Sequence, residues 1–160
     1  MMVPIDSREK LIAELGDTLD AANESSWPYV DLTDQSVNVH INRDYGDAEC
    51  EEDLEGHELV EMEPVSSRDA FKVMEDFADS RPEAQRNRLF DALNRRHPFS
   101  TFRYAVETLG ILQDWYAYKR EAYAAIAEEL LVFYKVDFED GMIVCKEKRN
   151  VREFFIESPD

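Results

Sequence analysis

The fold class is decided by residues 86–133, which read RNRLFDALNRRHPFSTFRYAVETLGILQDWYAYKREAYAAIAEELLVF. Apolar side chains recur in this stretch every three or four residues, the spacing of a helix with one buried face. The pair His97-Pro98 breaks the pattern and Gly110 interrupts it again, so the stretch predicts three helices in succession. The last of them runs from about residue 114 to 133. Its predicted core face consists of Trp115, Tyr118, Ala122, Ile126, Leu130 and Phe133.

Helix-start signals lie upstream of these core faces. Ser80 is expected to cap the first of the three helices, with Pro82 in its first turn, where a missing amide is harmless. Ser66 and Ser67 offer the N-cap of a further helix, whose predicted buried stripe runs from Ala70 to Ala78. A fifth helix is predicted over residues 6–22, whose opening Asp and Ser can accept hydrogen bonds from the free amides of the first turn.

Strand signals lie on both sides of the helices. Residues 29–41 predict a β-hairpin, because their second half alternates between apolar and polar side chains. A third strand is predicted over residues 59–62, and an Asp-Gly turn between two apolar runs predicts a C-terminal hairpin within residues 132–146. Beyond residue 150 the chain either packs at a sheet edge or frays. The predicted fold class is α+β, with about five helices packed with a small antiparallel β-sheet.

Length and charge bound the class of protein. A chain of 160 residues suffices for one domain with a buried core, so we predict a single domain over residues 1–160, frayed ends included. The net charge is -18, and a field of that sign repels phosphate backbones and anionic lipids. We therefore expect no nucleic-acid partner and no membrane partner. Such a surface is typical of ordinary soluble domains, and the alternative is an acidic face that docks a basic partner.

Cysteine spacing and the acidic residues exclude two further classes of site. Cys50 and Cys145 lack the spacing of a disulfide framework or of a zinc site. Separately, no apolar run approaches the roughly 20 residues of a membrane span. The sequence therefore predicts free thiols and a cytoplasmic location. Residues 42–58 form an acidic loop whose order of acids and glycine does not fit a calcium-binding loop. We expect no metal and no cofactor.

Several of these motifs resemble one known family. The predicted helix that follows Ser66 and Ser67 carries Met-x-x-Phe. After it come a Leu-x-x-Ala-Leu segment, a basic turn, Phe-x-x-Phe-Arg and a Trp-Tyr pair. The matching positions are Met74, Phe77, Leu89, Ala92, Leu93, Arg95, Arg96, Phe99, Phe102, Arg103, Trp115 and Tyr116. This order is similar to UPF0158, a bacterial family of uncharacterised proteins, over roughly residues 27–135. The resemblance implies a fold but no known activity.

The candidate site is an arginine-rich turn in a chain that is otherwise acidic. Residues 86–103 hold five arginines and one acid, Asp91. One interpretation is an anion site at the first turn of the helix that begins at Pro98, where free amides favour negative charge. The other is that the arginines pair with the acidic loop and fasten it to the helices. The candidate ligand-binding residues are Arg95, Arg96, His97, Arg103, Trp115 and Tyr116.

Two classes of function remain open. The leading hypothesis is a non-enzymatic protein-interaction or regulatory protein, which binds an unknown protein partner or forms a homodimer. The alternative is a small-ligand or anion-binding protein, or an enzyme of unknown chemistry, that uses the turn over residues 95–103. The sequence contains no nucleophile elbow and no glycine-rich phosphate loop, so it predicts no catalytic residues.

Overall fold

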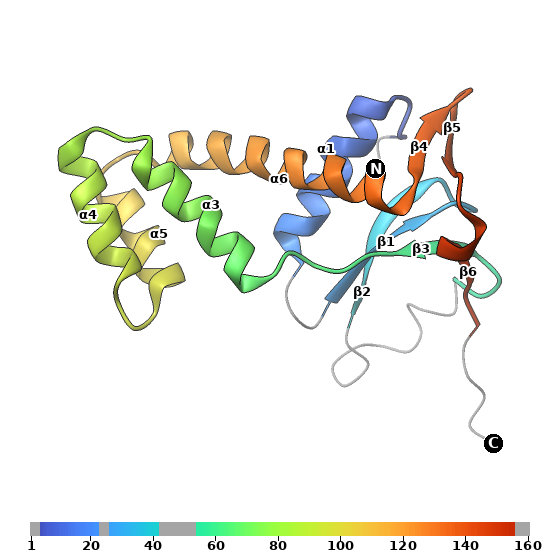
Figure 1. Ribbon diagram of the computed structural model, residues 1–160, viewed down its shortest axis with the longest axis horizontal. Helices are drawn as coiled ribbons and strands as arrows, with labels where there is room; N and C mark the ends of the chain where they lie inside the picture. The colour runs from blue at the N-terminus through green and yellow to red at the C-terminus, as the bar shows by residue number, and fades with distance from the viewer. Residues whose placement is uncertain (1–3, 23–25, 42–53, 156–160) are drawn as a thin grey trace, which may run out of the picture. The chain divides into compact units, whose positions relative to one another are not determined.

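The computed structural model describes residues 4–22, 26–41 and 54–155 (Figure 1). These residues form five α-helices and antiparallel strands, so the predicted α+β class is confirmed. In chain order the elements are α1 (Arg8–Ala21), β1 (Ser26–Asp31), β2 (Ser36–Ile41), β3 (Glu58–Glu61), α3 (Ser67–Asp79), α4 (Glu83–Leu93), α5 (Pro98–Thr108), α6 (Leu112–Tyr134), β4 (Val136–Glu139), β5 (Met142–Cys145), the 3-10 helix η1 (Lys148–Asn150) and β6 (Arg152–Glu153).

The chain packs as two compact units. The sheet unit comprises Met1–Val65 and Tyr123–Asp160, and the helical unit comprises Ser66–Ala122. Helix α6 begins in the helical unit and ends in the sheet unit. Compact packing does not test whether each unit folds alone, so the single domain stays a prediction.

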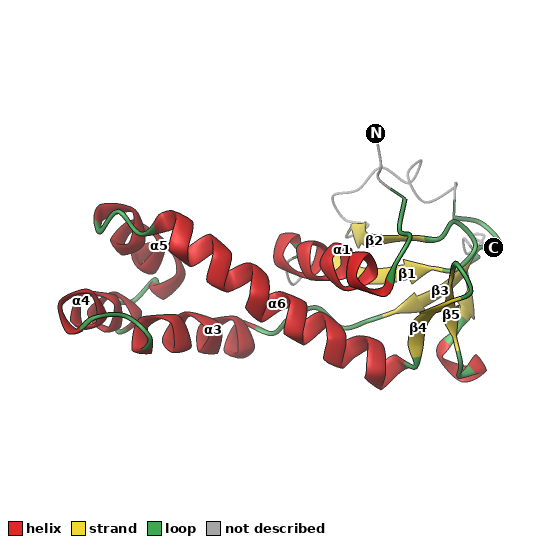
Figure 2. Ribbon diagram, turned by 90° about the horizontal axis from the view of Figure 1, so that it is seen from above, coloured by secondary structure: helices red, strands yellow, loops and turns green. Residues whose placement is uncertain are grey.

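The sheet unit contains a four-stranded antiparallel sheet in the order β2-β1-β3-β6. Val30 lies directly opposite Val37 on one neighbour and Val60 on the other, and all three are buried. Helix α1 runs beside this sheet and contacts β1 and β2 (Figure 2), and its Leu11 and Leu15 are completely buried. The predicted hairpin and the predicted third strand are therefore confirmed, and Val37 of the alternation lies in the core.

The C-terminal hairpin is confirmed but does not join the larger sheet. β4 and β5 form a separate two-stranded sheet, closed by Asp140 and Gly141 at φ 52° and 79°, the left-handed region that a tight hairpin turn requires. The Gln35 side chain accepts from the Ile143 backbone N–H at 2.6 Å and donates to its carbonyl at 3.0 Å. It therefore occupies the edge of β5 where another strand would pair.

The fourth strand of the larger sheet comes from the C-terminal residues instead. Arg152 of β6 lies opposite Leu59 of β3, and the following Phe154 is only 3% exposed. The Phe154 N–H donates to the His57 carbonyl at 2.8 Å. Of the two expectations for the residues beyond 150, packing at a sheet edge is confirmed for the described ones.

Side-chain caps explain where two helices begin and correct one prediction. Ser7 accepts from the Lys10 N–H at 3.1 Å, and Ser66 caps α3 in the predicted way. Ser80, however, does not cap the helix that follows it. It ends α3, its hydroxyl donating to the Phe77 carbonyl at 2.6 Å, and α4 begins three residues later with Pro82 at the N-cap.

The predicted core face of α6 is correct only in its first half. Trp115 is buried, but Phe133 is 73% exposed, and Ala122, Ile126 and Leu130 are not in the core. The buried residues of the second half are Tyr123, Ala127 and Leu131. The helix contributes to a different core in each unit, so no single stripe runs along its length.

Close packing of α1 against the second half of α6 depends on one glycine. A Cβ atom added at Gly16 would lie 3.3 Å from the backbone nitrogen of Ala124 and 3.4 Å from the carbonyl carbon of Tyr123. Helix propensity alone makes this glycine unfavourable by about 1 kcal/mol relative to alanine. Its position at the helix contact explains why a side chain is absent there.

Tyr123 beside this contact predicts a pH dependence of stability. Burial, with a contribution from the charge of Asp20, raises the pKa of the Tyr123 phenol above its ordinary value. Because the pKa is higher in the folded protein than in the unfolded chain, the neutral phenol contributes to the stability of the fold. This contribution is fully present below the unfolded pKa of about 10 and is lost as pH rises through the folded pKa. Tyr123→Phe should therefore lose less stability than wild type between pH 9 and pH 11 in urea unfolding. Equal losses in both proteins would contradict the prediction.

Candidate functional site

The core of the helical unit fixes the helices that carry the candidate residues. Phe77 of α3, Phe102 of α5 and Trp115 of α6 form a cluster, in which the Trp115 ring centroid lies 5.2 Å from Phe77 and 5.1 Å from Phe102. Trp115 is only 6% exposed. The structure thus places this candidate residue in the core, where it sets the position of α5 against α6.

Two other candidate residues form a contact between α5 and α6. Arg103 donates through Nη2 to the Tyr116 hydroxyl at 3.2 Å, and its Nε lies 3.3 Å from Glu107 Oε1. Arg103 is paired with a carboxylate one helical turn along α5, and Tyr116 comes from the helix beyond it. Arg103, Tyr116 and Trp115 do not line the pocket described next.

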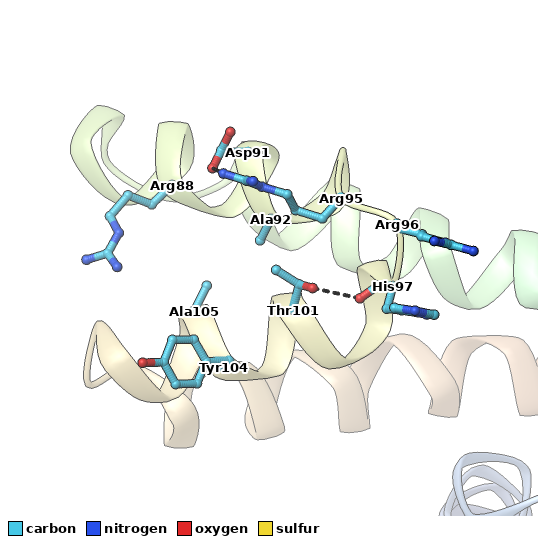
Figure 3. A pocket seen from close by; sticks show the side chains of 9 residues that line it. All are labelled: Arg88, Asp91, Ala92, Arg95, Arg96, His97, Thr101, Tyr104 and Ala105. Carbon is cyan, nitrogen blue, oxygen red and sulfur yellow. Dashed lines mark hydrogen bonds and ion pairs between the residues drawn. The ribbon is translucent and has the colours of Figure 1, made fainter.

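The remaining candidates lie together at an open pocket between α4 and α5, with a volume of about 460 Å³ (Figure 3). Its position follows from the sequence, because Pro98 starts α5 directly after the turn that ends α4. The α4–α5 pocket is lined by Arg88, Asp91, Ala92, Arg95, Arg96, His97, Thr101, Tyr104 and Ala105. Three predicted site residues are therefore brought together, on one side of a short helical hairpin.

The floor of the α4–α5 pocket is apolar and its rim is charged or aromatic. Ala92 and Ala105 are 4% and 7% exposed and face each other from the two helices. The Thr101 hydroxyl donates to the His97 carbonyl at 2.8 Å, so it is already used within the first turn of α5. Tyr104 is 70% exposed at the rim. Such a surface offers apolar contact in the middle and polar groups around it.

The arginines at the rim do not converge on one point. Arg95 runs back along α4 and donates to Asp91 at 3.0 Å, whereas Arg88 and Arg96 extend toward opposite ends of the pocket (Figure 3). Within the described residues, no carboxylate pairs with Arg88 or Arg96. The pocket therefore carries two arginines that are available to a ligand and that point away from each other.

Other arginines of the predicted cluster pair with acids on the helices themselves. Arg86 lies 3.1 Å from Asp79 of α3. Arg95, just beyond α4, pairs with Asp91 of that helix, and Arg103 pairs with Glu107 one turn along α5. The hypothesis that the cluster fastens the acidic loop involves residues 42–58, most of which, residues 42–53, lie outside the described residues.

Sequence reasoning missed a buried polar pair in the sheet unit. Asp31 is 1% exposed, and its Oδ2 lies 2.7 Å from Nδ1 of His57. Its other oxygen accepts from the N–H groups of Thr33 and Asp34 at 3.0 and 2.9 Å. The Asp-x-Thr-Asp order is a signal for such a side-chain turn, but nothing in the sequence connects it to a histidine that precedes another strand.

A second histidine lies on the same face of the sheet. The His40 ring stacks between Tyr29 and Phe154, with centroids at 4.3 and 5.6 Å, and its Nε2 lies 3.2 Å from Glu61. These contacts explain why a residue on the polar side of the predicted alternation is covered.

In residues 4–22, 26–41 and 54–155, no three His, Cys, Asp or Glu side chains are placed to share a metal ion. Nor does that part of the chain contain a helix both long and apolar enough to cross a membrane.

Comparison with known proteins gives one match. The model of a family described as an uncharacterised protein family, UPF0158, matches residues 4–141. This range includes the whole helical unit and the resemblance noted from the motifs, and it extends further toward both ends. No curated protein and no solved structure matches the chain.

Proposed function

This chain belongs to the uncharacterised protein family UPF0158, whose description assigns no activity, and we propose from its own residues that it is a non-enzymatic protein-interaction protein. The proposed interaction surface is the α4–α5 pocket. The observation that carries the proposal is the separation of Arg88 and Arg96 across an apolar floor, with Tyr104 exposed at the rim. Exposed aromatic and arginine side chains around an apolar centre are the residue types that contribute most to protein interfaces.

A small-anion site remains the second candidate, because a volume of about 460 Å³ lies in the range of small-molecule pockets. A single phosphate or carboxylate, however, is best bound by donors that converge on it. Arg88 and Arg96 point apart, and Arg95 is already paired. An extended segment of a protein could contact both free arginines at once, which favours the protein partner.

The proposal is tested by placing a photo-crosslinking amino acid at Tyr104 in the chain expressed in its native host. The matched control places it at Phe133, an aromatic residue of the sheet unit with almost the same exposure, 73% against 70%. We expect crosslinking to a defined protein from position 104 and not from position 133. A second copy of this chain as the crosslinked species would identify a homodimer.

Two results would overturn the proposal. One is the absence of protein crosslinks at position 104, and the other is an unchanged crosslink in the variant Arg88→Glu/Arg96→Glu. Native mass spectrometry distinguishes a small-anion site from a protein-interaction surface. A small-anion site should give a small-mass adduct that Arg96→Glu removes.

The proposal includes a cytoplasmic location. What supports it is that the two cysteines of the sequence lack disulfide-framework spacing, as is usual in a reducing compartment. Cys145 is a free thiol whose Sγ lies 3.4 Å from the Tyr134 carbonyl oxygen and 3.3 Å from that of Glu147. Cys50 lies outside the described residues.

A further inference from the structure

The charges at the α4–α5 pocket define the kind of partner that would bind there. Its rim has three arginines and one aspartate, Asp91, whose charge Arg95 offsets. Arg88 and Arg96 are left as two positive charges, in a chain whose net charge is -18. A partner that neutralises them must present negative groups of its own.

We propose that the α4–α5 pocket binds an acidic peptide segment with an apolar residue at its centre, an inference that rests on the proposed function. The apolar residue packs on Ala92 and Ala105 beside the Tyr104 ring, where the floor has no free hydroxyl to satisfy. Carboxylates on either side of it pair with Arg88 and Arg96. Arginine suits this role, because its planar guanidinium binds a carboxylate through two parallel hydrogen bonds.

The distance between the two arginines sets the spacing of the acidic residues. Arg88 lies five residues before Leu93, the last residue of α4, and Arg96 lies three residues beyond it. A rise of about 1.5 Å per residue within the helix and at most about 3.3 Å per residue beyond it place the two Cα atoms at most roughly 17 Å apart. Their side chains point away from each other, which widens the distance between the guanidinium groups. An extended peptide advances about 3.3 Å per residue, so carboxylates about four or five residues apart span the pocket.

The acidic surface of the chain increases the specificity of this site. The chain has twice as many acidic as basic residues, 36 against 18, so most of its surface repels an acidic segment. Attraction is confined to places where positive charges are concentrated. Repulsion elsewhere on the surface disfavours other binding modes, which is how unfavourable contacts contribute to specificity. The described arginines that lack a carboxylate partner are Arg68, Arg88, Arg96 and Arg120, and two of these four border the α4–α5 pocket.

The test measures fluorescence anisotropy with two labelled peptides of about ten residues, enough to cover the pocket in extended form. The acidic probe has two glutamates five residues apart, with leucine and alanine between them and neutral residues at both ends, and the neutral probe has glutamine in place of each glutamate. We expect the acidic probe to bind at least about tenfold more tightly than the neutral one. Arg88→Glu/Arg96→Glu should weaken acidic-probe binding at least about tenfold, since each charged hydrogen-bonded contact contributes about that factor.

The matched control is Arg68→Glu/Arg120→Glu, which changes the net charge equally at two exposed arginines away from the pocket. It should bind the acidic probe as wild type does. Equal binding of the two probes, or equal losses in the two double variants, would overturn the inference. So would a single-stranded oligonucleotide or inorganic phosphate that displaces the acidic probe from the pocket at lower concentration than an unlabelled acidic peptide.

The outcome is distinguishable from a failure of the proposed function. A protein crosslink at Tyr104 without binding of the acidic probe would leave the interaction function standing and reject the acidic partner. Absence of both would reject both proposals.

Discussion

Phe77→Ala should lower the free energy of unfolding by about 3–5 kcal/mol, the usual cost of removing a fully buried aromatic side chain. Phe77 is 2% exposed and contacts Phe102, Trp115 and Tyr118, whose ring centroids lie 6.4, 5.2 and 5.3 Å away. These residues come from α3, α5 and α6, so the cavity would lie where the three helices meet. Urea unfolding followed by Trp115 fluorescence in a Trp27→Phe background measures the loss in the helical unit.

Phe99→Ala is the matched control for this prediction. Phe99 is 47% exposed and lies in the first turn of α5, in the same unit. Its replacement should change the free energy of unfolding by less than about 1 kcal/mol, because most of its surface is already in water. Equal effects of the two substitutions would contradict the assignment of Phe77 to the core.

Gly16→Leu should destabilise the sheet unit by about 3 kcal/mol, the upper part of the usual range for overpacked cores. Leucine gains helix propensity relative to glycine, but its side chain would have to enter the contact between α1 and the backbone of α6 at Ala124. Backbone atoms cannot rotate away as a flexible side chain can, so the two helices would have to separate. Far-UV circular dichroism during urea unfolding provides the measurement.

Two further substitutions make this prediction specific to the close contact. Gly16→Ala should change stability by less than about 1 kcal/mol, since the gain in helix propensity offsets a contact that is tight by only a few tenths of an ångström. Ala13→Leu on the exposed face of the same helix should be nearly neutral. If Gly16→Leu were as stable as Ala13→Leu, the two helices would not be in close contact at this residue.

Local patterns in the sequence were sufficient for most elements of the fold. Ser7 and Ser66 are helix caps because their side chains can bond to nearby amides, and the Asp140-Gly141 turn requires φ values that few other pairs adopt. All of these signals act over a few residues. They predict where an element begins or turns, and the structure confirms them there.

Features that depend on residues far apart in the chain could not be predicted in the same way. The contacts of Gln35 with Ile143, and of Asp31 with His57, join positions that no local pattern connects. The burial of Tyr123 instead of Ala122 depends on which core the second half of α6 joins. At the α4–α5 pocket, the arginine-rich turn was visible in the sequence, whereas the opposite directions of Arg88, on α4, and Arg96, in the turn beyond it, were not.

The division of the sheet unit into residues 1–65 and 123–160 has a consequence for synthesis on the ribosome. The helical unit is continuous in sequence, so its core can close before the rest of the chain is translated. At about 5–20 residues per second, residues 123–160 take about two to eight seconds to add. During that interval α1 lacks Tyr123 and Ala124, its neighbours at Gly16, and β3 lacks β6, so the core of the sheet unit cannot be completed until these last residues are added.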